Sequence, residues 1–368
     1  MRTEGWRRPT AVLLPILAVA LAYYLGGRIG LLQRVVVDGA EVTPLWLPTG
    51  IALASLLWLG LRVWPGIAIG TYLSIEGING FDLTGLVIVA GNTLAMVCAY
   101  LMLRRAGFRT ELDRLRDALS LVFLGGLLPM TISATIGTWT LVLSGDLPVA
   151  EFWPVWSAWW AGDAMGVIVV TPLLLVLRRV LPARRRGDGY RALEVTALAV
   201  CAVAVTLVAT RTELSLLFLV FPLIIWAAVR FQLAGSAPCT LLVSVLSISA
   251  AIEHVGPFAD RSLLETMINL QGLNGAAALT GLLLSALVTE QNNIRLKIEQ
   301  VCEDLAELVE HLAPGKKPDR WTEPDPKALA DDELARLPPA LAAFHRLARL
   351  RPALHRFSNP VLLHPQHA

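Results

Sequence analysis

Ten apolar stretches separated by short polar segments constrain the fold more than any other feature of the sequence. They cover residues 10–32, 46–61, 63–77, 84–103, 119–143, 153–177, 192–210, 214–230, 236–253 and 267–289. A helix that crosses a bilayer needs about 20 mostly apolar residues. Only 16% of the residues are charged, whereas soluble domains have about 25%. We therefore predict an all-α fold, a polytopic transmembrane helix bundle of about eight to ten spans followed by a short cytoplasmic helical tail.

The first three stretches bear on topology. The first follows a basic N-terminus, but its apolar run exceeds the ~7–15 residues of a signal peptide, so we expect a retained transmembrane helix. The second and third are short and are separated only by Leu61, Arg62 and Val63. They form either a tight helical hairpin or a pair in which one member is partly re-entrant.

The distribution of arginine predicts the orientation. With the N-terminus inside, the cytoplasmic segments hold sixteen basic residues: Arg2, Arg7, Arg8, Arg62, Arg104, Arg105, Arg109, Arg114, Arg116, Arg178, Arg179, Arg184, Arg185, Arg186, Arg191 and Arg230. The outer loops hold three: Arg34, Arg211 and Arg261. Cytoplasmic loops of membrane proteins are enriched in Lys and Arg. We therefore expect a multi-pass protein of the bacterial plasma membrane with both termini in the cytoplasm.

The predicted outer loops limit how a ligand can bind. They are QRVVVDGAEVTP, EGINGFDL, SGDLPVAE, RTE and EHVGPFADRSLLE, and none is long enough to form a separate binding domain. A ligand must therefore be recognised within the helix bundle or at its outer rim.

Composition also bounds the partners. The four cysteines and six histidines show no metal-ligand spacing, so we expect no metal and no cofactor. The net charge of +2 is too small to indicate nucleic acid. The lipid bilayer is the partner that the composition predicts.

A carboxylate lies inside the sixth span, in WWAGDAMGVIVVTPLLL at residues 159–175. If the span begins near Trp153, Asp163 lies roughly 10–15 Å deep at 1.5 Å per residue. An ionised carboxylate there costs ~2.5–3.5 kcal/mol and usually faces a cavity or a partner. Arg28, in the first span, is a candidate partner because a guanidinium suits a carboxylate. Alternatively, Asp163 is protonated and merely bonded to a neighbouring helix, and Arg28 snorkels to the interface.

Glycine pairs at four-residue spacing accompany these charges. They are Gly26 and Gly30 around Arg28, Gly162 and Gly166 around Asp163, and Gly66 and Gly70 in WPGIAIG. Such pairs let two helix backbones approach closely. We therefore hypothesise that the first and sixth spans pack together with Asp163 and Arg28 between them. Asn92 and Asn274 also lie within spans, either as interhelical hydrogen-bonding residues or as part of a ligand site.

Three separated motifs resemble those of the MASE1 family of integral-membrane sensor domains. They are LAYYLGGRIGLL, VTPLWLPTGIALASLLWLGLRVWPGIAIGTYL at residues 42–73, and the WWAGDAMGVIVVTPLLL stretch. The matching positions are Arg28, Pro44, Trp46, Pro48, Gly50, Trp64, Pro65, Gly66, Gly162, Asp163, Gly166 and Pro172. The resemblance covers about residues 10–290 and implies a multi-pass bacterial sensor, usually fused to a cytoplasmic output domain. It assigns these positions no agreed chemistry, but it makes Trp46 and Pro48 candidates for ligand binding or signalling.

After the last span, apolar residues follow the heptad spacing of a coiled coil. They are Ile294, Ile298, Val301, Leu305, Leu308 and Leu312, at intervals of 4, 3, 4, 3 and 4. We expect residues 291–313 to form a signalling helix that pairs with a second copy or with a cytoplasmic partner. The run is shorter than the ~3–4 heptads usually needed, so an amphipathic helix on the membrane surface is the alternative.

The domains that we expect are a cytoplasmic N-terminus at 1–9, the membrane sensor domain at 10–290, the signalling helix at 291–313, and residues 314–368. The last segment begins with the proline-rich linker KKPDRWTEPDPK and continues with short amphipathic helices, partly disordered. It carries no GGDEF or EAL signature, kinase H-box or ATP-binding motif. We therefore expect no enzyme activity.

Two functions fit these observations. One is a sensor that detects a small ligand or a membrane-associated cue within its bundle and relays it through the cytoplasmic helix to a partner. The alternative is a secondary transporter or channel in which Asp163 serves as an intramembrane ion or proton site, as carboxylates in transport pathways do.

Overall fold

The computed structural model describes residues 7–32, 35–37, 40–79, 83–180, 189–213, 216–259 and 263–312. It confirms the all-α fold, with one short antiparallel hairpin, β1 (Val35–Val37) and β2 (Ala40–Val42), in which Val36 pairs with Glu41. The predicted cytoplasmic N-terminus (for the most part) and the tail at 314–368 lie outside the described residues. The chain divides into two compact units, Met1–Lys297 and Ile298–Ala368.

All ten predicted spans coincide with helical segments. The helices are α1 (Arg7–Leu31), α2 (Leu47–Leu59), α3 (Trp64–Asn79), α4 (Leu83–Arg105), α5 (Leu115–Ser120), α6 (Leu128–Ser144), α7 (Phe152–Met165), α8 (Thr171–Val180), α9 (Gly189–Arg211), α10 (Val220–Phe231), α11 (Leu233–Ile252) and α12 (Leu263–Leu312). Short 3-10 turns precede α3, α7 and α10 and lie between α11 and α12. Two π-helical segments, Leu121–Leu127 and Gly166–Val170, join α5 to α6 and α7 to α8.

Seven of the described helical segments are long and apolar enough to cross a membrane, counting α5 to α6 and α7 to α8 as single spans. Two shorter apolar helices, Leu47–Leu59 and Leu217–Phe231, accompany them. The chain is therefore a multi-pass membrane protein. The second predicted span, α2, is too short at 13 residues to cross a bilayer unaided.

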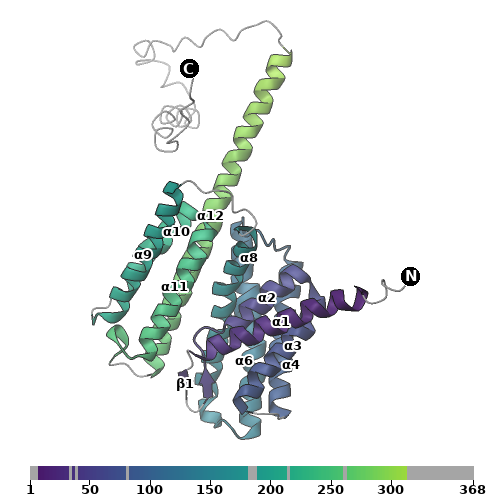
Figure 1. Ribbon diagram of the computed structural model, residues 1–368, viewed down its shortest axis with the longest axis vertical. Coiled ribbons are helices and arrows are strands. Elements are labelled where there is room, and N and C mark those ends of the chain that lie inside the picture. Colours follow the sequence, from purple (N-terminus) through teal and green to yellow (C-terminus); the bar gives the residue numbers. More distant parts are fainter. Residues whose placement is uncertain are drawn as a thin grey trace, which may run out of the picture. The chain divides into compact units, whose positions relative to one another are not determined.

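Within the first unit, α1 packs against both α2 and α3 (Figure 1). Glycines make the α1–α3 contact close, because a Cβ at Gly66 would collide with the Ile16 carbonyl and one at Gly70 would lie 2.6 Å from the Tyr23 Cβ. Gly60, with a φ of 80°, provides the turn between α2 and α3. The tight connection between α2 and α3 was thus predicted correctly. Both helices pack against α1.

The two π-helical segments pack against each other. A Cβ at Gly126 would lie 3.1 Å from Ile168, and the indole Nε1 of Trp160 donates to the Leu127 carbonyl at 2.7 Å. A π-helical turn shifts the backbone hydrogen bonds by one residue and often occurs at functional sites. In this protein the π-helical turns leave backbone carbonyls that can accept hydrogen bonds from side chains of other helices.

Helices α9, α10 and α11 form a second group and lie side by side in Figure 1. Ion pairs join α9 to its neighbours near both of its ends: Arg230 contacts Glu194 at 2.9 Å, and Arg211 contacts Glu253 at 3.0 Å. Exposed pairs of this kind contribute about 0.2–1 kcal/mol each. The α9–α11 group therefore depends mainly on its apolar packing.

Candidate functional site: a buried polar network beside a re-entrant segment

Asp163 is buried among three helices, with 1% of its surface exposed. Its Oδ2 lies 2.7 Å from the hydroxyl of Ser133 on α6. The same hydroxyl lies 2.6 Å from Oδ1 of Asn92 on α4. The carboxyl of α7, the hydroxyl of α6 and the amide of α4 thus form one continuous buried network.

This network is one hydrogen short when Asp163 is ionised. The Ser133 hydroxyl has a single hydrogen and lies between two acceptor oxygens. Either a protonated Asp163 donates to Ser133, which then donates to Asn92, or the Asn92 amide is turned so that its nitrogen donates to Ser133. The protonation of Asp163 and the orientation of Asn92 are therefore coupled through Ser133.

The backbone of α7 around Asp163 is bonded to a segment that precedes and begins α2, residues 43–50, which we call the wedge. The Trp46 N–H donates to the Gly162 carbonyl at 3.0 Å, and the Thr49 hydroxyl lies 3.0 Å from the Asp163 carbonyl. Gly162 is ten residues into α7, about 15 Å along the helix. Non-helical backbone at such depth is tolerated only when protein surrounds it. The wedge fits the re-entrant alternative for the second span.

Glycines make room for the wedge. A Cβ at Gly162 would collide with the Thr43 carbonyl, and one at Gly166 with the Trp46 carbonyl. A Cβ at Gly50, on the wedge itself, would collide with the Gly166 carbonyl. The Thr171 hydroxyl adds a hydrogen bond to this contact, which it donates to the Gly50 carbonyl at 3.2 Å.

The other side of the wedge contacts α1. A Cβ at Gly26 would lie 2.6 Å from the Ile51 side chain and 3.8 Å from Pro48, and one at Gly30 would lie 3.4 Å from the Trp46 ring. The hypothesis that the first and sixth spans pack directly on their glycine faces is therefore wrong. Both faces contact the wedge, which lies between them.

The proposed pairing of Arg28 with Asp163 is also wrong. Arg28 is exposed, and no ion pair joins the two residues in the described part of the chain. Helix geometry explains the difference, because residues turn by about 100° each and Arg28 therefore points about 160° away from each of Gly26 and Gly30. An exposed arginine at this position fits the snorkelling alternative.

Helix α12 contacts the wedge directly. Gln271 donates from Nε2 to the Pro44 carbonyl at 2.9 Å. One turn further along, Asn274 is fully buried, and neither its Oδ1 nor its Nδ2 has a hydrogen-bond partner among the described residues. Asn274 is thus not part of the Asp163 network.

At its other end within the first unit, α12 bonds the beginning of α5. Oε2 of Glu290 accepts the backbone N–H of Leu115 at 2.9 Å. That N–H is one of the unpaired donors at a helix N-terminus, where a carboxylate is favourable. Further along α12, the side chains of Ile294, Ile298, Val301, Leu305 and Leu308 are between 52% and 59% exposed. The side chain of Leu312 lies outside the described residues.

Sequence reasoning missed three residues that complete the site: Thr49, Ser133 and Gln271. Each is polar within or beside an apolar stretch, which was the available signal, but serine and threonine are common in membrane helices. Groups of His, Cys, Asp and Glu suited to a metal ion are absent from the described residues.

Comparison with known proteins shows the family to which the chain belongs. The MASE1 family matches residues 15–292, about three quarters of the chain. The chain belongs to the MASE1 family. Its MASE1 motifs meet in space. Pro44, Trp46, Pro48 and Gly50 form half of the wedge, which contacts Gly162 and Asp163 of α7 and Gly166 of the π-helical segment after it.

The MASE1 domain is a membrane sensor domain, and the chain has a role in membrane signalling. The probable diguanylate cyclase DgcE of Escherichia coli K12 is 26% identical over 241 residues. The match covers 62% of this chain and 20% of that relative, so the chain spans a small part of the length of the curated protein it matches. No solved structure matches the chain.

Proposed function

We propose that this protein is a sensor that detects a small ligand or a membrane-associated cue within its helix bundle and passes the change through α12 to a cytoplasmic partner or to a second copy. The observation that carries the proposal is the length of α12 and the set of elements that it contacts. One continuous helix contacts the wedge at Gln271, bonds α5 at Glu290 and carries the exposed apolar residues from Ile294 to Leu308.

The Asp163 network is suited to report a change in the bundle. It joins α4, α6 and α7 through one shared hydroxyl, and the backbone beside it is bonded to the wedge. Buried polar networks favour discrete arrangements, because a partly satisfied network is costly. A cue that shifts the wedge would change this network and the Gln271 contact together.

The exposed apolar residues of α12 support an intermolecular contact. Five large side chains at coiled-coil spacing are more than half exposed, and this seam would be buried by a second helix. The arginine distribution predicts that this part of α12 lies in the cytoplasm. Output chemistry would then belong to the partner, and we propose no catalytic activity for this chain.

Crosslinking at Cys302 tests the relay. Cys302 is exposed on α12, and replacing Cys98, Cys201 and Cys239 by alanine leaves it as the single reactive thiol. We expect oxidation in native membranes to capture a second copy or a cytoplasmic partner, and the captured fraction to change in Asp163→Asn. Deleting residues 290–312 should abolish output while the spans still insert.

The transporter alternative predicts the opposite pattern. Vesicles containing the protein would show an ion or proton flux that depends on Asp163, and the flux would survive deletion of residues 290–312. That result would overturn the sensor proposal.

A further inference from the structure

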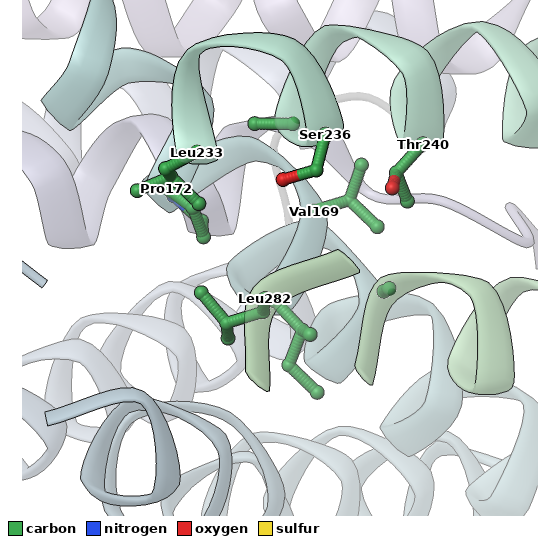
Figure 2. A pocket seen from close by; sticks show the side chains of 9 residues that line it. Val169, Pro172, Leu233, Ser236, Thr240 and Leu282 are labelled. Atoms are coloured by element: carbon green, nitrogen blue, oxygen red, sulfur yellow. The ribbon is translucent and has the colours of Figure 1, made fainter. Parts of the chain in front are cut away.

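The cavity between α8, α11 and α12 is small (Figure 2). It measures about 10 Å³ and is lined by residues that include Val169, Pro172, Ser236, Thr240 and Leu282. This volume is close to the room that one water molecule needs. A larger ligand therefore does not fit there, whereas the exposed surface of the first unit can bind one.

The arginines near the predicted cytoplasmic ends of the helices differ in their partners. Three of them form ion pairs with carboxylates, namely Arg109, Arg179 and Arg230. Others are exposed and form no ion pair in the described part of the chain, among them Arg62, Arg104 and Arg178. An arginine without a carboxylate partner can bind a phosphate through its fork of N–H donors.

Two of the unpaired arginines lie at the turn between α2 and α3. Arg178, in the last turn of α8, has its Cζ 5.3 Å from the centroid of the Trp58 ring, near the end of α2. A cation over an aromatic face is attracted to the ring, while its N–H groups can still bind an anion. Arg62 lies in the 3-10 turn that follows α2, four residues after Trp58.

Arg104 approaches the same turn from the end of α4. Its Nη1 donates to the Tyr100 hydroxyl at 3.0 Å. A Cβ at Gly60, which begins the turn, would lie 4.0 Å from that hydroxyl. The turn, α4 and α8 thus each contribute one unpaired arginine around the α2–α3 connection.

Large apolar side chains flank this charge. Leu61 and Trp64, on either side of Arg62 in the chain, are 40% and 48% exposed. Tryptophan is enriched where the bilayer meets water. A soluble anion gains nothing from such side chains, whereas a phospholipid places acyl chains beside its charged headgroup. The combination favours a lipid over a free phosphate.

We propose that the surface around the α2–α3 turn binds the headgroup of an anionic phospholipid through Arg62, Arg104 and Arg178. Basic sites between helices on the cytoplasmic side of membrane proteins bind such headgroups, and the arginine distribution predicts that this turn faces the cytoplasm. The inference names a class of membrane-associated cue, and it rests on the proposed function for its role in signalling. Because α2 begins within the wedge, a lipid bound at its other end would bias the position of the wedge.

Lipid binding by the full chain tests the site. Native mass spectrometry of the purified protein measures the binding of phosphatidylglycerol, which is anionic, and of phosphatidylcholine, which has no net charge. We expect a preference for phosphatidylglycerol that falls about fivefold in Arg178→Gln and about thirtyfold in Arg104→Gln/Arg178→Gln, because each arginine contributes a similar attraction to an anionic lipid.

The matched control is Arg211→Gln/Arg230→Gln, which removes the same net charge from exposed arginines that have carboxylate partners. This variant should retain the preference. Equal losses in the two double variants would overturn the site, since net charge alone would then explain the binding. Displacement of the lipid by an equal concentration of glycerol 3-phosphate would overturn the assignment to a lipid in favour of a free phosphate.

Crosslinking through Cys302 tests the link to signalling separately. In vesicles of phosphatidylcholine, added phosphatidylglycerol should change the crosslinked fraction of the native protein and leave that of Arg104→Gln/Arg178→Gln unchanged. Lipid binding without this change would retain the site and overturn its role as a cue. A native protein that does not prefer phosphatidylglycerol, but whose crosslinking still responds to Asp163→Asn, would overturn the site and leave the sensor proposal standing.

Discussion

The α1–α8 part and the α9–α12 part of the bundle differ in how many of their buried polar groups are hydrogen-bonded. Around Asp163, side chains and backbone from α4, α6, α7 and the wedge satisfy one another. Along α9, α11 and α12, by contrast, lie seven of the eleven buried polar side-chain atoms that have no partner among the described residues. The other four such atoms lie in the first region, on Thr93, Asp113, Asp117 and Thr138, so the first region leaves fewer buried polar atoms unpaired than the second.

This difference indicates which part can move. An element fixed by backbone contact and a satisfied network has one favoured arrangement. A helix interface with unsatisfied polar groups, in contrast, can gain hydrogen bonds in another arrangement. Without a cue the wedge region would therefore act as the frame that holds its position, and α12 would shift when a cue moves the wedge.

The largest expected effect concerns the glycine contacts of the frame. Gly166→Ala should lower the free energy of unfolding by about 3 kcal/mol, because the added methyl group meets the Trp46 carbonyl and the Thr49 hydroxyl. Gly272→Ala on α12 is the control, since a Cβ there has no neighbour within 4 Å. It should be neutral or raise stability. Denaturant unfolding in detergent micelles measures both, and equal effects would break the comparison.

The next effect concerns the Ser133 hydroxyl, which Asp163 and Asn92 share. Ser133→Ala leaves Asp163 and Asn92 without a common partner and should lower stability by about 1–3 kcal/mol. Thr131→Ala, two residues earlier on α6, removes a hydroxyl that bonds the Leu128 carbonyl of the same helix. That change should fall within about 0.5 kcal/mol. A Ser133→Ala variant as stable as Thr131→Ala would show that the network does not hold the frame.

The same substitution at two asparagines sharpens the comparison. Asn92→Leu should lower the stability of the protein, because Ser133 loses a bonded partner. Asn274→Leu should raise it by up to about 1 kcal/mol, because an unsatisfied amide is replaced by an apolar group of similar size. Thermal unfolding of the two variants shows whether each one gains or loses stability. A loss of stability in both would contradict the claim that the Asn274 amide is unsatisfied.

The smallest effect concerns the ion pairs of α9. Glu194→Gln removes the partner of Arg230 at the surface and should lower stability by less than about 1 kcal/mol, an effect that fades at high salt. Unfolding at low and high ionic strength measures this. A loss comparable to that of Gly166→Ala would mean that charge, not packing, holds the α9–α11 group.

Much of the fold could be predicted from the sequence, because apolar length and helical spacing are local properties. The ten helical segments, the short α2 and the position of Asp163 followed from these. Glycine spacing marked Gly162 and Gly166 as points of close approach, but spacing does not say what approaches. The neighbour is the wedge, whose backbone bonds to α7 depend on tertiary packing. Likewise, nothing in one sequence selects Ser133 from the other hydroxyls as the partner of Asp163.

We propose that α12 responds to the position of the wedge and carries the change to its exposed apolar residues from Ile294 to Leu308. The most direct test compares Gln271→Leu, which removes the bond to Pro44, with Asn269→Leu, which removes a bond within α12 to the Glu265 carbonyl. Crosslinking through Cys302 in native membranes is the readout. We expect a changed crosslinked fraction in Gln271→Leu and a native fraction in Asn269→Leu. Identical fractions in the native protein and both variants would contradict it.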